Sequence, residues 1–296
     1  MRVLVEMSFD VKIGWSIKKD QVQKKESFLF KLISLNLNGI RSASNKGLEA
    51  WLAKQQADCI CVQELKAQEA DMKGVLDELA QMKGYFHYAQ KKGYSGVGVY
   101  TRHEPTDVIV GCGTEEFDAE GRYIELRFDN AQQKRSIISA YFPSGSSGED
   151  RQEAKYRFLD HIYPHLDALR HEREFVVCCD LNIAHKEQDL KNFKGNKNNS
   201  GFLPQEREWL SQLIEKQGVV DVYRHLHPST TDECYTWWSN RGQAYAKNVG
   251  WRLDYHLATS KIAHAALHSE IYKEEKFSDH APLIVHYAND AFGLNG

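Results

Sequence analysis

Residues 28–36 read FLFKLISLN, and this stretch sets the interpretation of the whole chain. Its apolar residues follow one another with little alternation, and the run stops at Asn36. The runs ADCICVQE (57–64) and EFVVCCDLN (174–182) have the same character and also end in polar side chains. Apolar runs of this kind are typical of strands that are covered on both faces by other layers. The sequence therefore predicts sheets in the interior of the molecule.

Five further runs predict strands, and four stretches between the runs have apolar residues at helical spacing. The further strands are expected at 96–102, 121–128, 135–142, 251–259 and 281–287. The helices are expected at 47–56, 71–82, 156–169 and 204–217, and a long loop at 191–201. Because strands and helices interleave without a proline- or serine-rich linker, a single α/β domain with sheets in the middle and helices outside is the simplest architecture.

The ends of the chain differ from this central pattern. The interpretation places one domain at 28–290, an N-terminal extension of unknown role at 1–27 and a C-terminal tail at 291–296. Within the extension, apolar and other residues alternate over 11–17, which is compatible with an added strand. A dispensable leader is at least equally favoured, because residues 18–27 are strongly polar. Charges interrupt the extension and it lacks a continuous apolar segment, so it is not a signal peptide.

Composition excludes several classes of protein. The chain has 296 residues, of which 42% are hydrophobic and 27% charged, as in an average globular protein, so disorder and fibrous folds are excluded. No apolar run approaches the roughly 20 residues that span a bilayer, so no membrane partner is expected. The chain carries 38 Lys and Arg against 41 Asp and Glu, a net charge of −3. A polyanionic partner would therefore require local basic groups or a metal ion.

The cysteines indicate a reducing compartment. None of the six forms a CxxC pair, and four of them lie inside apolar runs. Buried reduced thiols in a cytosolic protein are therefore expected, rather than a metal or redox site. The six are Cys59, Cys61, Cys112, Cys178, Cys179 and Cys234.

Polar side chains stand at or next to the ends of six predicted strands. They are Asn36, Asn38, Glu64, Tyr141, Asp180, Asn182, Asp254, Ser278, Asp279 and His280. One such residue is unremarkable, but strand ends lie side by side in a sheet, so six of them predict one pocket. The set offers carboxylates and amides without a cysteine cluster, which favours Mg²⁺ or Mn²⁺ over zinc.

Seven motifs in fixed order give the chain a family resemblance. They are NLNGIRS (36–42), ICVQELK (60–66), GYSGVGVYTR (93–102), CDLNIAH (179–185), GFLPQERE (201–208), KNVGWRLDYHLA (247–258) and SDHAPL (278–283). Together they resemble the exonuclease III family of abasic-site DNA endonucleases, within the DNase I-like phosphodiesterases. The resemblance implies a four-layer α/β sandwich, two packed mixed β-sheets flanked by helices. It also implies a monomer that cuts double-stranded DNA 5′ to an abasic site, leaves a 3′-hydroxyl and trims blocked 3′ ends. We expect this protein in the cytoplasm, associated with the nucleoid if it is bacterial.

The resemblance also implies roles for the strand-end residues. Glu64 is similar to the principal Mg²⁺ ligand of the family, with Mn²⁺ as a plausible substitute. The residues expected around the same ion are Asn36, Asn38, Asp279, Asp180 and Asn182. Asp180 resembles the residue that activates water, and Asn182 the residue that orients this water. His280 is similar to the imidazole on the scissile phosphate, with Asp254 orienting its ring, and Tyr141 resembles a phosphate-contacting phenol.

A second group of residues is implied in binding DNA. Asn196 and Asn199 match amides near the phosphates of the abasic nucleotide. Trp237, Trp251 and Leu253 match the apolar walls of a pocket for a flipped sugar without a base. The remaining candidates for DNA contacts are Tyr94, Lys91, Lys92, Arg241, Lys247, Asn248 and Arg252. His185 is expected to be a loop histidine that supports the site.

Some features leave the activity open. Asn38 stands where some members carry Asp, and Ser144 replaces an amide found in some relatives. The balance between abasic-site cleavage, 3′-end trimming and processive 3′→5′ exonuclease activity therefore stays open. An enzyme that is mainly a 3′-end-trimming phosphodiesterase or exonuclease is the alternative. Two further hypotheses are a phosphatase of inositol phosphates or lipids and a catalytically idle DNA-binding protein. The motifs GFLPQER and KNVGWRLDYHL argue against the phosphatase, and the retained polar residues argue against the idle protein.

Overall fold

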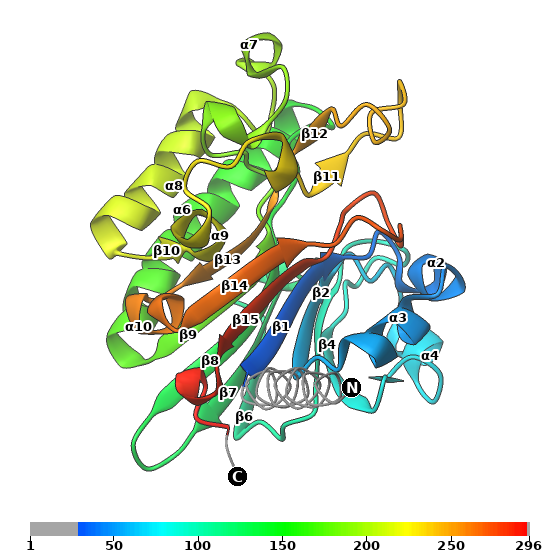
Figure 1. Cartoon of the computed structure of the whole chain (residues 1–296), viewed down its shortest axis with the longest axis vertical. Helices are drawn as coiled ribbons and strands as arrows, with labels where there is room; N and C mark the ends of the chain where they lie inside the picture. The colour runs from blue at the N-terminus through cyan, green and yellow to red at the C-terminus, as the bar shows by residue number, and fades with distance from the viewer. Residues whose placement is uncertain (1–28, 295–296) are drawn as a thin grey trace, which may run out of the picture.

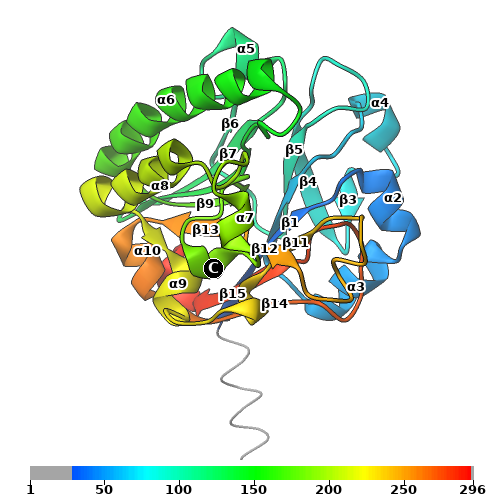
Figure 2. The same ribbon diagram turned by 90° about the horizontal axis from the view of Figure 1, so that it is seen from above.

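The computed structural model of the chain describes residues 29–294, which form two mixed β-sheets packed face to face with helices outside (Figure 1 and Figure 2). The seven-stranded sheet has the order β14 (Ala266–Ile271), β15 (Leu283–Ala288), β1 (Leu29–Asn36), β2 (Cys59–Gln63), β5 (Val97–Thr101), β4 (Met82–His87) and β3 (Glu78–Leu79). The six-stranded sheet has the order β10 (Val220–Asp221), β13 (Asp254–Ala258), β9 (Glu174–Asp180), β8 (Lys134–Tyr141), β7 (Tyr123–Asp129) and β6 (Asp107–Val110).

Each sheet contains one parallel pair among antiparallel neighbours. β1 runs parallel to β2, and β8 runs parallel to β9. A separate small sheet pairs β11 (Trp237–Trp238) with β12 (Gly250–Trp251). The carboxyl ends of β1, β2, β8 and β9 lie at the same end of the molecule, where Asn36 donates to Asp180, and the candidate functional residues converge there.

Helices form the two outer layers. α2 (Ile40–Asn45), α3 (Leu48–Gln55) and α4 (Glu69–Met72) lie outside the seven-stranded sheet, and α6 (Glu149–Glu172) and α8 (Pro204–Gln217) outside the six-stranded sheet (Figure 2). The shorter helices are α5 (Glu115–Asp118), α7 (Phe193–Asn196), α9 (Val222–Leu226) and α10 (Ser260–His264), with 3₁₀ turns at Glu187–Asp189, Asp232–Cys234 and Asn289–Ala291. The predicted four-layer sandwich is confirmed. Among the residues described, no helix has the length and apolar character needed to cross a membrane.

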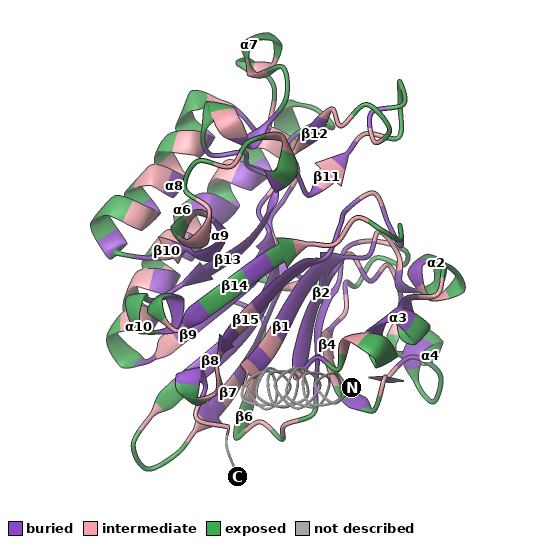
Figure 3. Ribbon diagram, viewed as in Figure 1, coloured by how far each residue is buried: buried purple, intermediate pink, exposed green. Residues whose placement is uncertain are grey.

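Three apolar cores separate the four layers, and successive strand residues contribute to different cores. Leu32 faces the core between the sheets, whereas Ile33 faces the helices α2–α4. Val176 and Val177 divide in the same way between the central core and the core beneath α6 and α8. Side chains alternate in direction along a strand, so a strand covered on both faces must be apolar at successive positions. Figure 3 shows the strands largely buried and the outer faces of the helices exposed.

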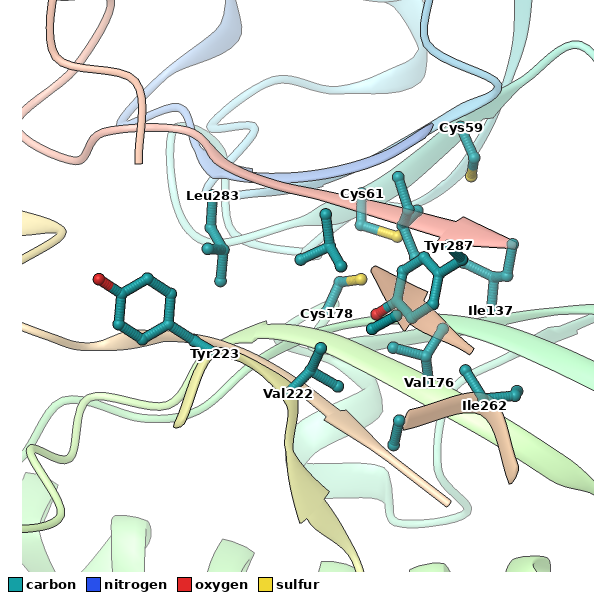
Figure 4. Packing of buried hydrophobic residues seen from close by; sticks show 14 of the residues in the cluster. Cys59, Cys61, Ile137, Val176, Cys178, Val222, Tyr223, Ile262, Leu283 and Tyr287 are labelled. Carbon is teal, nitrogen blue, oxygen red and sulfur yellow. The ribbon is translucent and has the colours of Figure 1, made fainter. Parts of the chain in front are cut away.

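The cysteines lie inside these cores. All six are buried and free, as the sequence predicts. Cys59 and Cys61 from β2 and Cys178 from β9 lie in the core between the two sheets (Figure 4). Burial raises the pKa of the Cys61 thiol well above its usual value. Because the thiolate is the reactive form, these side chains behave as small apolar residues.

The helix predicted at 71–82 is wrong. Only its beginning belongs to α4, which ends at Met72, and its end belongs to β3 and β4. Gly74, Ala80 and Gln81 have positive φ angles of 73°, 49° and 63°, so the backbone turns repeatedly instead of continuing a helix. The apolar residues at helical spacing are still buried, but turns and short strands present them. In the loop predicted at 191–201, residues 193–196 form the single turn of α7.

A buried cluster of ion pairs underlies the small sheet. Arg252 donates from Nε to Oδ1 of Asp189 at 2.8 Å and from Nη2 to Oδ2 of Asp221 at 2.7 Å. Arg224 also donates to Asp189. Burial alone would raise the pKa of Asp189, but the two guanidinium groups outweigh it and hold this pKa well below its usual range. Arg252 is fully buried, so the prediction that it contacts the DNA backbone is wrong.

We expect Asp189→Asn to lower the free energy of unfolding by about 3–5 kcal/mol, because it leaves buried guanidinium groups without their charge partner. The native carboxylate has a depressed pKa, so its contribution is present above the unfolded value near ~4 and is lost as pH falls. Urea unfolding at pH 7 and at low pH measures both effects. The control is Glu104→Gln, which removes the exposed ion pair with Lys83 and should cost less than about 1 kcal/mol. Equal losses in the two variants would contradict the role assigned to the cluster.

Candidate active site

The polar strand-end residues meet at one end of the two sheets, beside β11 and β12 (Figure 1). Asn36 is the last residue of β1, and Tyr141 and Asp180, the last residues of β8 and β9, are paired in register. Asp254, the first residue of β13, pairs with Asp180 from the other side. Tyr141 and Asp180 line a cavity of about 700 Å³, whereas Asn36 and Asp254 are fully buried next to it. The predicted residues that line it are Glu64, Tyr141, Asp180, Asn182, Asn199, Trp237, Trp251, Leu253, Asp279 and His280.

His280 lies between two buried carboxylates. Its Nδ1 is 2.8 Å from Oδ2 of Asp254, and its Nε2 is 3.7 Å from Oδ2 of Asp180. Burial alone would lower the pKa of His280, but Asp254 and Asp180 raise it to about 10. The imidazole is therefore a cation at neutral pH, and its bond to Asp254 fixes the orientation of the ring. Its Nε2–H points toward Asp180 and the cavity, where it can donate to an anion.

Asp180 is the most strongly perturbed carboxylate of the site. It is buried, and burial raises its pKa above the usual range; His280 lowers it, whereas Asp254 and Glu64 raise it further. The backbone N–H of Asn182 donates to Oδ1 of Asp180 at 3.0 Å, and the amide of Asn36 donates to Oδ2 at 2.8 Å. A carboxylate with a raised pKa and a fixed orientation is suited to accept a proton near neutral pH.

A second group of side chains, which offer oxygen atoms as metal ligands, lies beside Asp254, His280 and Asp180. Asn36 donates to Oε1 of Glu64 at 2.9 Å, and Asn38 donates to Oδ1 of Asp279 at 2.8 Å. Burial would raise the pKa of Glu64, but Lys66 outweighs it and lowers this pKa. For Asp279, the imidazolium of His280 and the donors from Asn38 and Trp237 likewise outweigh burial and lower the pKa. Both carboxylates are therefore charged at neutral pH, as ligands of a hard cation must be.

The ammonium group of Lys66 lies against Glu64 and Asn38, which shows that these oxygen atoms attract a cation. Its Nζ is 2.7 Å from Oε2 of Glu64 and also donates to the amide oxygen of Asn38. The chemistry of these donors therefore fits Mg²⁺ or Mn²⁺, with Glu64, Asn38 and Asp279 as the oxygen ligands at hand. The amide oxygen of Asn36 accepts the backbone N–H of Asn38 at 2.9 Å. Its place among the ligands stays a prediction.

A further group of acidic side chains could hold a cation. Ligand atoms of Asp180, Asp254 and His280 all lie within 4.8 Å of one another. His280 as an imidazolium has no lone pair for a metal, so this group binds an ion only through its carboxylates. The charge of the site thus favours an ion near Glu64 and a proton on His280.

Tyr141 closes one side of the cavity and rests on a buried arginine. The guanidinium carbon of Arg122 is 4.8 Å from the centre of the Tyr141 ring, and its Nη1 donates to the Tyr141 carbonyl at 3.0 Å. Burial raises the pKa of Tyr141, and Glu64 and Asp180 raise it further. The phenol is therefore protonated and can donate into the cavity. Arg122 also donates to the hydroxyl of Tyr94 at 3.0 Å, which places Tyr94 behind Tyr141.

Aromatic rings form the opposite wall. The rings of Trp237 and Trp251 lie edge to face, with centroids 6.5 Å apart, and Leu253 packs with them in a small apolar cluster. The indole N–H of Trp237 donates to Oδ2 of Asp279 at 3.1 Å. The apolar wall is therefore tied directly to a predicted metal ligand, so the charged cluster and the aromatic wall share one cavity.

Several predicted residues lie outside the lining of this cavity. Asn196 is partly exposed and accepts a hydrogen bond from Asn199 at 2.8 Å. Asn248 accepts from the indole of Trp238 and donates to the carbonyl of Asp232, so it supports the loop between β11 and β12. Lys91, Lys92, Arg241 and Lys247 are exposed. Their contacts with DNA stay predictions.

His185 faces away from the cavity. Its Nε2 is 2.8 Å from the hydroxyl of Ser211 on α8, and burial lowers its pKa to about 3. It therefore stays neutral at physiological pH. The expectation of a supporting loop histidine agrees with these contacts.

Sequence reasoning missed other residues of the site. Gln152 lines the cavity, and Lys66 contacts Glu64 at its edge. Lys155 and Glu206 are buried behind its wall. Lys66 and Glu206 do stand inside quoted motifs, QELK and PQERE, where their charge next to assigned residues was a usable signal. Gln152 and Lys155 lie at the start of α6, before the helix predicted at 156–169, so no predicted element placed them near the site.

Comparison with known proteins agrees with this geometry. Residues 33–280 match the Endonuclease/Exonuclease/phosphatase family. The chain is 38% identical to an exodeoxyribonuclease of Bacillus subtilis (strain 168), covering 86% of this chain and 97% of that protein. It is 36% identical to the DNA repair nuclease APEX1 of Danio rerio, covering 87% and 82%. The crystal structure of the AP endonuclease LMAP from Leishmania major superposes with a TM-score of 0.79 at 26% identity, covering 89% of each chain.

Proposed function

The chain belongs to the Endonuclease/Exonuclease/phosphatase family, and we propose that within it this protein is a metal-dependent DNA-repair phosphodiesterase. Its substrate would be double-stranded DNA that contains an abasic site, cut 5′ to that site to leave a 3′-hydroxyl. One observation carries the proposal: the acid–base cluster and the tryptophan wall line the same cavity. Relatives named for abasic-site cleavage and for exodeoxyribonuclease activity support it.

The cavity suits a nucleotide that has lost its base. Trp237, Trp251 and Leu253 line the cavity with mainly apolar surface, and the indole N–H of Trp237 is already bound to Asp279. A normal nucleotide must also break pairing and stacking to leave the helix, at a cost of a few kcal/mol, which an abasic sugar largely escapes. Selection would therefore come from the apolar wall and from this difference in cost, while the phosphate groups are common to all substrates.

The residues of the site supply what phosphodiester hydrolysis requires. We propose that Asp180 accepts the proton of the attacking water and that Asn182 orients this water. The oxygen of the water bonds to phosphorus and the bond from phosphorus to the 3′ oxygen breaks, so the phosphate stays on the abasic nucleotide. The 3′ oxygen takes up a proton from solvent and leaves as a hydroxyl. His280, held by Asp254, donates to a non-bridging oxygen, and Tyr141 donates from the other side. Preorganised donors of this kind stabilise the charge that develops in the transition state.

A divalent cation would complete the site. We propose Mg²⁺, with Mn²⁺ as a substitute, held by Glu64, Asp279 and the neighbouring asparagine oxygens. When bound there, it would neutralise negative charge on the phosphate. We also propose that the protein acts as a monomer.

Nicking of a duplex with one internal tetrahydrofuran abasic analogue tests the proposal. With Mg²⁺, we expect a single incision 5′ to the analogue and a 3′ end that a DNA polymerase extends. An undamaged duplex and a recessed 3′ end are assayed alongside. Faster digestion of the recessed end than incision would favour the alternative of a mainly 3′-trimming enzyme. Binding without cleavage of any of the three would contradict the proposal.

A further inference from the structure

A buried ion pair lies directly behind the wall of the cavity, and we propose that it positions the pocket for the abasic nucleotide. The pair joins Lys155 on α6 to Glu206 on α8, with Nζ 2.6 Å from Oε1 and both side chains fully buried. Neither residue lines the cavity. The inference rests on the proposed function and names residues that would act on substrate selection through others.

Lys155 connects the pair to the loop that follows β9. Its Nζ donates to the backbone carbonyl of Asn182 at 2.8 Å. Asn182 has a positive φ of 54°, a left-handed conformation that asparagine tolerates better than most residues other than glycine. Its side-chain amide donates to the carbonyl of Phe142 at 3.0 Å and lies 3.3 Å from Asp180. Lys155 therefore helps to set where the Asn182 amide lies next to Asp180.

Glu206 connects the pair to residues 198–203, which we call the pocket loop. Its Oε2 accepts the backbone N–H groups of Gly201 at 2.7 Å and of Leu203 at 3.0 Å. Its Oε1 accepts Gln152 Nε2 at 3.1 Å and faces the hydroxyl of Ser200 at 3.4 Å. One carboxylate therefore holds three positions of the pocket loop, and it has no acceptor capacity left for water.

The held loop supports the tryptophan wall. A Cβ at Gly201 would lie 3.3 Å from Cζ3 of Trp251 and 3.1 Å from the Asn182 carbonyl, so the ring packs against bare backbone. Gly201 also has a φ of 92°, which favours glycine. Its carbonyl accepts the N–H of Ala184 at 2.8 Å. A shift of the pocket loop would therefore move both Trp251 and the backbone carbonyl of Asn182, the residue predicted to orient the water.

The pair is not explained by stability alone. A buried ion pair is often no more stabilising than a well-packed apolar pair, because both charges lose their hydration. The hydrogen bonds of this pair hold two segments that line the cavity, residue 182 and residues 198–203. Its geometry is that of a brace for the substrate pocket.

The test compares two reactions that share the hydrolytic residues but differ in their use of the pocket. One is incision at an internal tetrahydrofuran, where a sugar must enter. The other is removal of a 3′-phosphate from a duplex end, where only a phosphate is placed at the cluster. We expect Glu206→Gln to lower kcat/KM for incision about tenfold or more, since small displacements at an oriented site are costly. The 3′-phosphate reaction should change much less. Lys155→Arg, which keeps the charge and the donors, should largely retain the ratio of the two reactions.

The matched control is Glu116→Gln on α5. It removes an exposed ion pair with Arg157, which lies on α6, the helix that carries Lys155. It should leave the ratio unchanged. If both reactions of Glu206→Gln fall by one factor, the pair acts on the fold or on the shared hydrolytic residues and not on the pocket, and the inference is overturned. If Glu206→Gln does not fold, Glu206→Asp keeps the charge, shortens the reach to Gly201 and Leu203, and carries the same test. A wild type that does not incise the analogue at all would instead contradict the proposed function.

Discussion

The double variant Asp180→Asn/His280→Asn should incise an abasic duplex hardly more slowly than either single variant. Each replacement alone should lower kcat by at least about 10³-fold, roughly 4 kcal/mol of barrier, because it removes one member of a preorganised group. The two side chains lie 3.7 Å apart, and each shifts the pKa of the other. Residues that act in one step lose little more once the first is gone.

Single-turnover incision of the tetrahydrofuran duplex measures these effects without interference from product release. His225→Asn is the control, because His225 is exposed on α9, away from the cavity lining, and its loss should leave the rate unchanged. Strictly multiplicative losses in the double variant would show that Asp180 and His280 act in separate steps. In that case the assignment of a shared step would be wrong, although both residues would still belong to the site.

Glu64→Ala should abolish metal-dependent incision with little loss of DNA affinity. The variant removes a carboxylate that the structure keeps charged, and leaves Lys66 and Asn36 without their shared partner. We expect the rate at saturating Mg²⁺ to fall by at least about 10³-fold. Affinity for DNA, measured by fluorescence anisotropy in chelator, should change by only a few-fold.

Chelation of the wild type should give the same result reversibly. Incision should stop in EDTA and return with Mg²⁺ or Mn²⁺. Glu69→Ala is the matched control, since Glu69 is exposed at the start of α4 and has no contact with the cavity. Full activity of the wild type in excess chelator would contradict the metal assignment.

The layers could be predicted from the sequence because a strand that is buried on both faces has apolar residues at successive positions. Leu32 and Ile33 face different cores, and a continuous apolar run is the direct trace of this arrangement. The helix expected at 71–82 is wrong although Met72, Leu76 and Leu79 have the spacing of a helix. Met72 ends α4, Leu76 lies in a turn and Leu79 belongs to β3, and all three are buried in the same core. Spacing records which residues are buried, and it does not record the backbone path between them.

The site was predictable where its residues end strands, and not where partners come from distant elements. Asp180 and Asp254 stand at strand ends, so their convergence could be expected before the fold was known. Lys155 and Glu206 are 51 residues apart and meet only because α6 and α8 pack side by side. Arg252 illustrates the opposite error, since a charged residue inside a recognised motif suggested a surface role while its real partners are buried aspartates.

The buried thiols have a practical consequence for experiments with attached dyes. All six cysteines lie in packed cores, and burial raises the pKa of the Cys61 thiol and of the Cys178 thiol. A thiol-reactive reagent added to the folded protein should therefore find no rapid target among them. A single cysteine placed at Gln132, in an exposed turn between β7 and β8, would carry the only label without any native cysteine being removed. Fluorescence on single molecules could then follow the enzyme as it searches along DNA.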